Sequence, residues 1–371
     1  MNAPLSEIER LARLRLARSE NVGPVTFRDL LQHCGNAVAA IDALPDLAAR
    51  GGAKRAIRIA SAAEAETELS KLARLGARLL IWGDRDFPPR LAAIDPPPPV
   101  IAVMGDAELL SRPTIAIVGS RNASAAGRRI AGDMANALGT EGFAVVSGLA
   151  RGIDTAAHRA ALATGTVAVL AGGVDIAYPE ENRELQTAIA EGGALVSEMP
   201  PGTSPQSRHF PRRNRLISGL SLAVVVVEAA LRSGSLITAR FALEQGRDVF
   251  AVPGSPLDPR AGGSNRLIKD GAPLVETAED VIAALGTPPG VALREPDPTG
   301  YDGAKPFVTV FRQFDDRARD SVLAALGPTP TPLDEIVRQS GVPVPIVRAI
   351  LLELELAGHL HRDPGDRLSL V

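Results

Sequence analysis

The dominant pattern in the chain is a series of short apolar segments that alternate with amphipathic stretches. Apolar segments lie at 115–118, 143–146, 167–170, 194–197, 223–227 and 249–252, and helical patterns separate them near 125–138, 154–163, 181–190, 212–219 and 236–245. Uninterrupted apolar strands that alternate with helices are typical of a parallel sheet covered on both faces. The pattern therefore predicts an α/β fold over residues 113–285, with a Rossmann-like, doubly wound and mostly parallel sheet.

Residues 1–75 have helical periodicity, with a Gly-Pro turn at Gly23 and Pro24 between two helical segments. This helix-turn-helix arrangement resembles a helix-hairpin-helix (SAM-like) unit, in which amides of the turn can contact a DNA phosphate. It is equally typical of a small helical packing domain. No Lys or Arg flanks the turn closely, which favours the packing interpretation.

Residues 76–112 combine two strand patterns, at 78–82 and 100–104, with a proline-rich extended path. They predict a connector that packs on the central domain. Residues 286–306 are rich in Pro, Gly and Asp and predict a linker.

The last segment, 307–371, predicts a winged-helix domain. Helical patterns at 318–326, 333–339 and 344–357 precede a hairpin pattern with an Asp-Pro-Gly-Asp turn. Winged helices often read DNA through their third helix. Here that helix carries Arg348 together with Glu353 and Glu355, so a protein-interaction role is at least as consistent with the sequence.

Composition narrows the possible partners. The formal net charge is −3, so any binding of nucleic acid must depend on a local basic patch. Only four of the 40 basic residues are lysines, namely Lys54, Lys71, Lys269 and Lys305. An arginine excess suits phosphate binding, and a GC-rich genome explains it equally well.

One cysteine, Cys34, excludes a disulfide within the chain and a cysteine-based metal site. The N-terminus lacks the pattern of a signal peptide, and no apolar run reaches the roughly 18 residues of a membrane span. We therefore expect a cytoplasmic protein.

Candidate binding residues gather at the ends of the predicted strands. Gly119, Ser120 and Arg121 follow the first strand, and their amides and charge suggest an anion site at the mouth of the next helix. Ser147, Gly148 and Arg151 follow the second strand, and Gly173 follows the third. The glycines of a dinucleotide fingerprint are missing after Gly119, which argues against NAD or FAD.

Asp154 is predicted to cap the helix that follows the second strand. A single histidine within a helix more often has a structural than a catalytic role, so we expect His158 to be structural.

The segment 210–221 carries three arginines within four positions. It places Phe210 before Arg212, Arg213, Asn214 and Arg215, directly ahead of the apolar strand 223–227. Arginines beside an aromatic residue suit a surface that holds phosphate and base together. Further along, Lys269 adds to the basic residues of segment 264–271.

Several catalytic patterns are missing from the sequence. It has no metal-ligand spacing, no nucleophile elbow and no Walker lysine. We therefore predict no catalytic residue, no metal and no cofactor, and a site that holds phosphates without cleaving them. The residues alone are equally consistent with DNA and RNA.

The ordered motifs closely resemble the DNA-processing protein DprA (Smf) family over about residues 78–285. They are Gly-Ser-Arg at 119–121, Ser-Gly-Leu-Ala-Arg-Gly-Ile-Asp at 147–154, Tyr-Pro at 178–179, Phe-Pro-Arg-Arg-Asn-Arg at 210–215, Ser-Gly-Ser-Leu-Ile-Thr-Ala at 233–239 and Ala-Val-Pro-Gly at 251–254. The helical N-terminus and the winged-helix pattern also fit this family.

The resemblance implies a protein of bacterial natural transformation that binds and protects incoming single-stranded DNA and helps to load the RecA recombinase. It implies no enzyme activity, and a homodimer formed through the Rossmann-like domain. It assigns the strand-binding pocket to Ser120, Arg121, Ser147, Gly148, Arg151, Phe210, Arg212 and Arg213, with Asn214 and Arg215 bracing it.

The alternative is an enzyme on a related fold, a phosphoribohydrolase that processes nucleotides. Its catalytic acid is missing from the comparable stretch 233–239, and Glu228 is the nearest acid.

Overall fold

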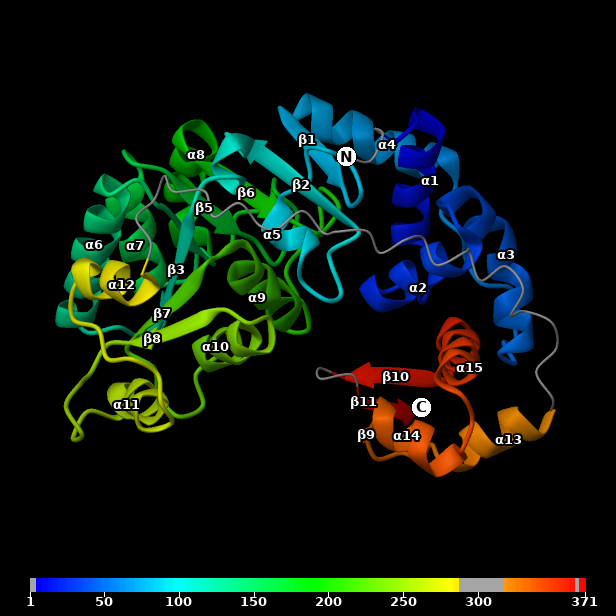
Figure 1. The fold of residues 1–371 in the computed structure, drawn as a ribbon. Helices are drawn as coiled ribbons and strands as arrows, with labels where there is room; N and C mark the ends of the chain where they lie inside the picture. The colour runs from blue at the N-terminus through cyan, green and yellow to red at the C-terminus, as the bar shows by residue number, and fades with distance from the viewer. Residues whose placement is uncertain (1–4, 287–315, 364–366) are drawn as a thin grey trace. The chain divides into compact units, whose positions relative to one another are not determined.

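The computed structural model describes residues 5–286, 316–363 and 367–371 (Figure 1). The chain divides into two compact units, one spanning residues 68–294 and the other combining 3–67 with 295–371. None of the described helices is long and apolar enough to cross a membrane. Apart from Gly286, the predicted linker 286–306 lies outside the described residues.

An eight-stranded sheet forms the centre of the first unit. Its strands are β1 (Ala77–Ile81), β2 (Val100–Gly105), β3 (Thr114–Gly119), β4 (Ala144–Ser147), β5 (Thr166–Val169), β6 (Ala194–Ser197), β7 (Ala223–Val227) and β8 (Asp248–Ala251). Their spatial order is β1-β2-β6-β5-β4-β3-β7-β8. Strands β3 to β8 pair in parallel, whereas β1 and β2 pair antiparallel at one edge. The two strands of the predicted connector therefore extend the central sheet.

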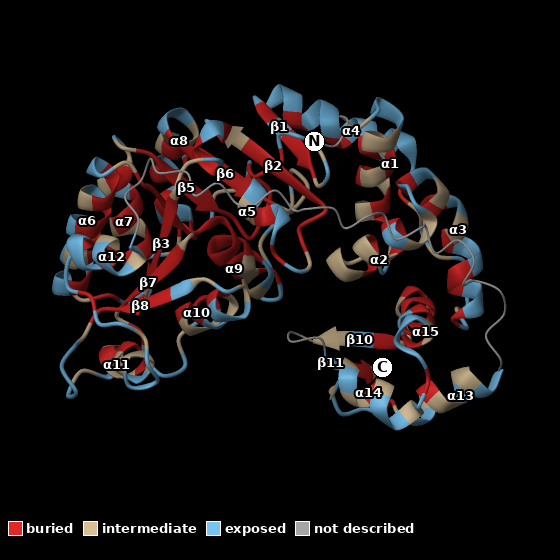
Figure 2. Cartoon of the chain, viewed as in Figure 1, coloured by how far each residue is buried: buried red, intermediate tan, exposed pale blue. Residues whose placement is uncertain are grey.

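Helices cover both faces of this sheet, which is why its strands are almost uniformly apolar (Figure 2). On β3, Ile115 and Ile117 pack under α6 (Ala125–Thr140), α7 (Ile153–Ala161) and α12 (Ala278–Leu285). Ala116 and Val118 face the opposite layer, which includes α5 (Pro89–Ala92), α9 (His209–Leu220) and α10 (Ser235–Glu244). Two further helices complete the unit, α8 (Arg183–Gly192) and α11 (Gly262–Lys269).

The order in which strands are added to the sheet reverses at β3. From β3 the chain moves through β4 and β5 to β6 on one side, and β7 and β8 then lie on the other side. The carboxyl ends of parallel strands beside such a reversal are the usual ligand position in α/β sheets. The predicted candidate residues after β3, β4 and β5 therefore lie at one edge.

Two local predictions were wrong. Helix α9 begins at His209, three residues earlier than the pattern indicated, so Phe210 belongs to the helix. Helix α7 has Gly152 as its N-cap, and Asp154 lies inside the first turn instead of capping it. Pro211 explains the first error, because a proline is tolerated in the first turn of a helix, where amides have no partner within the helix.

The second unit joins the two ends of the chain. Its N-terminal part consists of α1 (Glu7–Arg18), α2 (Pro24–Cys34) and α3 (Ala37–Arg50), and α4 (Ala62–Arg74) leads into the first unit. Its C-terminal part contains α13 (Asp316–Ala324), β9 (Thr331–Pro332), α14 (Leu333–Ser340), α15 (Val344–Leu356), β10 (Leu360–Asp363) and β11 (Arg367–Leu370). The antiparallel order β10-β11-β9 next to three helices confirms the winged-helix prediction. In the predicted hairpin turn, residues 364–366 lie outside the described residues.

Candidate functional site

A cavity of about 710 Å³ opens at the carboxyl ends of β3, β4 and β5. It collects five of the predicted site residues from two loops and a helix: Arg121, Gly148, Arg151, Phe210 and Arg213. Its other lining residues include Tyr178, Glu180 and Glu181 from the segment after β5. The sheet edge thus brings together residues that lie up to 92 positions apart in the sequence.

Phe210 is the centre of the cavity's aromatic and basic groups. Its ring centroid lies 5.3 Å from the guanidinium carbon of Arg121 and 5.9 Å from that of Arg213. The ring of Tyr178 lies 5.6 Å away, tilted by 57°. Two cations over one aromatic ring attract its π-electrons and leave their N–H groups available to oxygen ligands. The arrangement can hold a planar ring and an anion next to each other.

Helix α9 decides which side chains of the basic segment reach the cavity. Phe210 and Arg213 are three residues apart, so they lie on the same helix face. Arg212 is exposed and does not line the cavity. Asn214 donates a hydrogen bond to the carbonyl of Gly234 (3.2 Å), and Arg215 pairs with Glu198. The last two residues therefore fix the helix in place.

Arg213 is a buried cation at the wall of the cavity. Only 6% of its surface is exposed, and its Nε and Nη1 have no hydrogen-bond partner among the described residues. Burial lowers the pKa of its guanidinium to about 10, and the Asp154 carboxylate counteracts this effect. Arg213 therefore stays charged at neutral pH. Since unpaired buried N–H groups are costly, an oxygen ligand at this wall would be favoured.

Buried side chains fix the loop after β4 by accepting hydrogen bonds from its backbone amides. The Asp154 carboxylate accepts hydrogen bonds from the amides of Gly148 (3.1 Å) and Ala150 (3.2 Å). His158 Nε2 accepts one from the amide of Leu149 (3.3 Å), and burial lowers the pKa of His158 to about 3, so this imidazole is neutral. The sequence suggested that this loop binds an anion, but these three amides are already used.

The buried hydroxyl of Ser147 is also unavailable to a ligand, because it donates to the carbonyl of Ile117 (2.6 Å).

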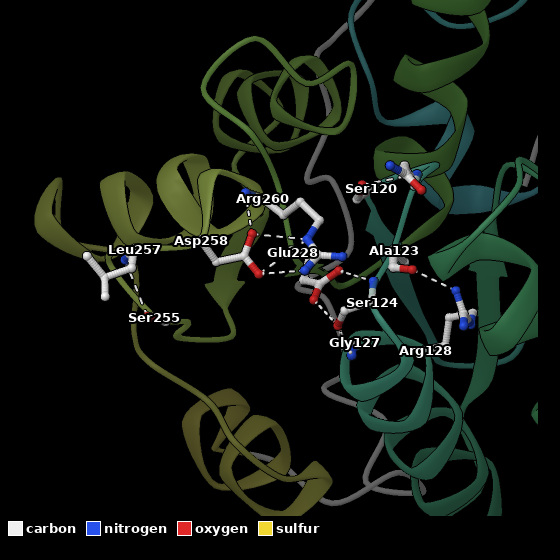
Figure 3. Close-up of polar contacts among 11 residues, drawn as sticks. Ser120, Ala123, Ser124, Gly127, Arg128, Glu228, Ser255, Leu257, Asp258 and Arg260 are labelled. Atoms are coloured by element: carbon white, nitrogen blue, oxygen red, sulfur yellow. Dashed lines mark hydrogen bonds and ion pairs between the residues drawn. The ribbon is translucent and has the colours of Figure 1, made fainter.

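The N-terminus of α6 is occupied by a carboxylate of the protein itself (Figure 3). Glu228, at the end of β7, accepts hydrogen bonds from the Ser124 amide (2.9 Å) and the Ser124 hydroxyl. A Cβ atom at Gly127 would lie 2.5 Å from the Glu228 carboxyl carbon, so a larger residue there would displace this carboxylate. The N-terminus of α6 is therefore occupied by Glu228, whose negative charge is favourable there. The contacts of Glu228 are with Ser124 and not with the predicted amides of Gly119, Ser120 and Arg121.

Arg151 lies at the rim of the cavity, and the remaining predicted residues lie outside its lining. Arg151 at the rim donates to Glu181 (2.8 Å), which balances its charge. Ser120 lies in the loop beside Arg121, where its hydroxyl accepts from the Asn122 amide (3.2 Å). Like Ser120, three more predicted residues lie outside the lining: Gly119, the last residue of β3, buried Gly173, whose amide donates to Thr203, and exposed Lys269 at the end of α11.

Sequence reasoning did not assign a binding role to Tyr178, Glu180 or Glu181. The Tyr-Pro motif at 178–179 was a usable signal for the first, because an aromatic residue before a turn after β5 lies at the same sheet edge. Nothing in the local pattern indicated the two glutamates. Among residues 5–286, 316–363 and 367–371, no group of three or more His, Cys, Asp or Glu side chains could hold a metal ion.

Comparison with known proteins identifies the family of the chain. The family model described as DNA recombination-mediator protein A matches residues 78–286, which include the whole cavity. The chain belongs to this family. Two further models match its ends: a DprA-like N-terminal HHH domain over residues 7–70 and a DprA winged helix domain over residues 313–366.

Relatives of the recombination-mediator family align over long stretches. Protein Smf of Escherichia coli is 43% identical over 302 residues, covering 78% of this chain and 77% of that protein. DNA processing protein DprA of Bacillus subtilis is 48% identical over 213 residues, covering 57% and 72% respectively. The resemblance stated from the motifs is thereby confirmed.

Two solved structures of this family share the fold. The X-ray structure of DprA from Streptococcus pneumoniae aligns with a TM-score of 0.61 and 35% identity, covering 76% of this chain and 98% of that one. DNA processing protein A from Helicobacter pylori aligns with a TM-score of 0.53 and 28% identity, covering 57% and 97%. The latter structure is described as giving insights into the single-stranded DNA binding mode of the Helicobacter pylori protein.

Proposed function

We propose that this protein binds single-stranded DNA in the cavity at the ends of β3, β4 and β5. The observation that carries the proposal is the position of two guanidinium groups, from Arg121 and Arg213, over the Phe210 ring. Single-strand binding proteins combine aromatic platforms for bases with cations for the backbone. The single-stranded DNA binding named for the Helicobacter pylori relative supports the same ligand.

The shape and charge of the cavity suit an unpaired strand. Tyr178 is 48% exposed next to Phe210, so an aromatic pair with one open ring faces an unstacked base. A duplex hides the faces of its bases in the stack and offers mainly phosphates and groove edges. Because the protein's net charge is −3, the attraction is local to this cavity.

We further propose that the protein acts by binding and catalyses no reaction. Glu228, the acid that an enzyme on a related fold could have used, is committed to Ser124 and the N-terminus of α6. Asp154 and His158 are buried and hold the loop 148–150. These contacts give all three groups a structural role.

In the cell, the proposed role is to protect incoming single strands during natural transformation and to help load RecA, in the cytoplasm and as a homodimer through the Rossmann-like domain. The family description, recombination mediator, supports this role, because a mediator delivers a strand to a recombinase.

Binding of a fluorescent oligo-dT by Arg121→Ala tests the proposed ligand. Loss of one charge-assisted phosphate contact should weaken binding about 10- to 150-fold, corresponding to about 1.5–3 kcal/mol. The control is Arg129→Ala, since Arg129 is an exposed arginine on α6 that pairs with Asp133 and does not line the cavity. Equal affinities for the two variants would contradict the assignment of the cavity.

A further inference from the structure

The third helix of the winged helix, α15, is buried on two faces. One stripe, made of Val347, Ile350, Leu351 and Leu354, belongs to the core of the winged helix itself. A second group of buried residues, Ala349, Leu352, Glu353 and Leu356, lies outside that core. A surface helix normally buries a single apolar stripe. The second face of α15 therefore has another partner.

That partner is the N-terminal helical domain, which lies in the same compact unit and packs α2 and α3 against α15. The two backbones pack closely at the end of α3. A Cβ atom on Gly51 would lie 1.9 Å from the carbonyl oxygen of Glu353 and 2.8 Å from the Ala357 Cβ. Only a glycine permits this approach.

Charged groups join the two domains at the same place. The Glu353 carboxylate is 1% exposed and pairs with Arg50 of α3 (3.1 Å) and with Arg319 of α13 (2.9 Å). A buried carboxylate requires such partners. Arg319 belongs to the winged helix itself, whereas Arg50 comes from the N-terminal domain, so docking adds a second cation beside the buried carboxylate.

Hydrogen bonds continue the contact past the end of α15. Asn21, in the turn between α1 and α2, donates to the carbonyl of Leu356 (3.0 Å). A ring nitrogen of His359 lies 3.0 Å from the carbonyl oxygen of Gly52. The turn between α1 and α2 and the third helix of the winged helix are the two segments outside the central domain that the sequence analysis considered for DNA contact. In the structure they contact each other.

The charge of the winged helix also argues against a DNA-reading role. Residues 316–371 contain eight carboxylates and six arginines, a formal charge of −2. The exposed first turn of α15 presents Val344, Pro345 and Arg348, so it offers one basic side chain. Elements that bind DNA depend on clustered Lys and Arg for their affinity.

We propose that the second face of α15 is a docking surface for the protein's own N-terminal helical domain, and that the winged helix joins the two ends of the chain instead of reading DNA. The ligand of this surface is the α2–α3 pair, recognised through the close approach at Gly51 and the Arg50–Glu353 ion pair. This role is separate from single-strand binding in the cavity and does not depend on it.

Hydrogen exchange of the full-length protein with Gly51→Leu tests the docking. Gly51 has φ −66°, so a leucine fits its own backbone and conflicts only with α15. Amides at 352–358 should exchange at least about tenfold faster than in the wild type, while those of β3 and β4 stay unchanged. Gly23→Ala is the matched control, because the space around Gly23 is open.

Arg50→Glu provides a second, independent variant that places a like charge beside Glu353, and it should accelerate the same amides. This variant decides the question if Gly51→Leu also exposes α1 and so disturbs the N-terminal domain itself. Unchanged exchange at 352–358 in Arg50→Glu, or in Gly51→Leu with α1 still protected, would overturn the proposal. Protection of α15 by duplex DNA in the wild type would overturn it as well, because the helix would then be a DNA reader.

Discussion

Replacing Gly148 with alanine should displace the buried guanidinium of Arg213 from its place in the cavity wall without removing any charge. A Cβ atom at this position would lie 1.3 Å from Nη1 and 2.4 Å from Cζ of Arg213. An ordinary contact needs about 3.5 Å, so the guanidinium must shift by about 2 Å. Gly148 does not have a positive φ, so alanine suits its backbone and the loop should still form.

The displaced guanidinium should lose its contact with the strand. A hydrogen bond to a charged group contributes about 1.5–3 kcal/mol, so we expect about a 10- to 150-fold weaker affinity for oligo-dT in fluorescence anisotropy. Gly132→Ala is the control: Gly132 lies in α6, where the nearest side-chain atom would be 3.8 Å from the new Cβ. Thermal unfolding of both variants checks the fold.

If Gly148→Ala bound oligo-dT within twofold of the wild type, Arg213 would not contact the strand. The assignment of this buried arginine to phosphate binding would then be refuted, although Arg121 could still act there. Direct removal of Arg213 is less informative, because it would leave the Asp154 carboxylate buried without its cation and destabilise the fold.

Two further predictions separate stacking from charge and test the loop support. Phe210→Leu should weaken oligo-dT binding by about 1–3 kcal/mol while the salt dependence stays as in the wild type, since no charge is lost; a changed salt slope would show that Phe210 acts through the arginines. His158 has its pKa lowered by burial to about 3 from 6.5, so its stabilising contribution is present above pH 6.5 and is lost as the pH falls towards 3. Through His158, the wild type should lose about 2 kcal/mol of its free energy of unfolding between pH 7.5 and pH 5. In urea unfolding, His158→Gln should lack this part of the loss. The same pH dependence in both proteins would contradict the neutral buried imidazole.

Much of the fold could be predicted from the sequence because the central strands are buried on both faces. Segments such as 115–118 and 223–227 are apolar at every position, and such runs between helical patterns leave few alternatives to a parallel sheet. The winged helix followed from helix and turn signals in the same way. The membership of β1 and β2 in the sheet is harder to predict, because an antiparallel edge depends on contacts with distant β6.

The candidate site was only partly predictable, for a related reason. Local motifs identified Arg121, Phe210 and Arg213, but they gave Arg212 equal weight, since the start of α9 decides which side chain faces the cavity. The role of Glu228 depends on a contact with Ser124, 104 residues away. Amides that a motif offers to a ligand can be used by such a distant side chain, and no local pattern shows this.

The sequence of α15 contains a pattern that predicts a second buried face. The segment 344–356 is apolar around most of its circumference, which a helix with one buried face does not need. The second apolar stripe indicates a partner, whereas the identity of that partner depends on the close approach at Gly51 in the folded chain.

The central claim is that a single strand lies on Phe210 and Tyr178, and photochemical cross-linking tests it most directly. An oligo-dT strand with one 5-iododeoxyuridine is bound to the full-length protein, irradiated, and mapped by mass spectrometry of the cross-linked peptides. Iodouracil reacts with aromatic side chains that stack on it, so the cross-link should fall on Phe210 or Tyr178, and an excess of unlabelled oligo-dT should suppress it. A cross-link confined to peptides outside the cavity, such as those of α15, would contradict the account.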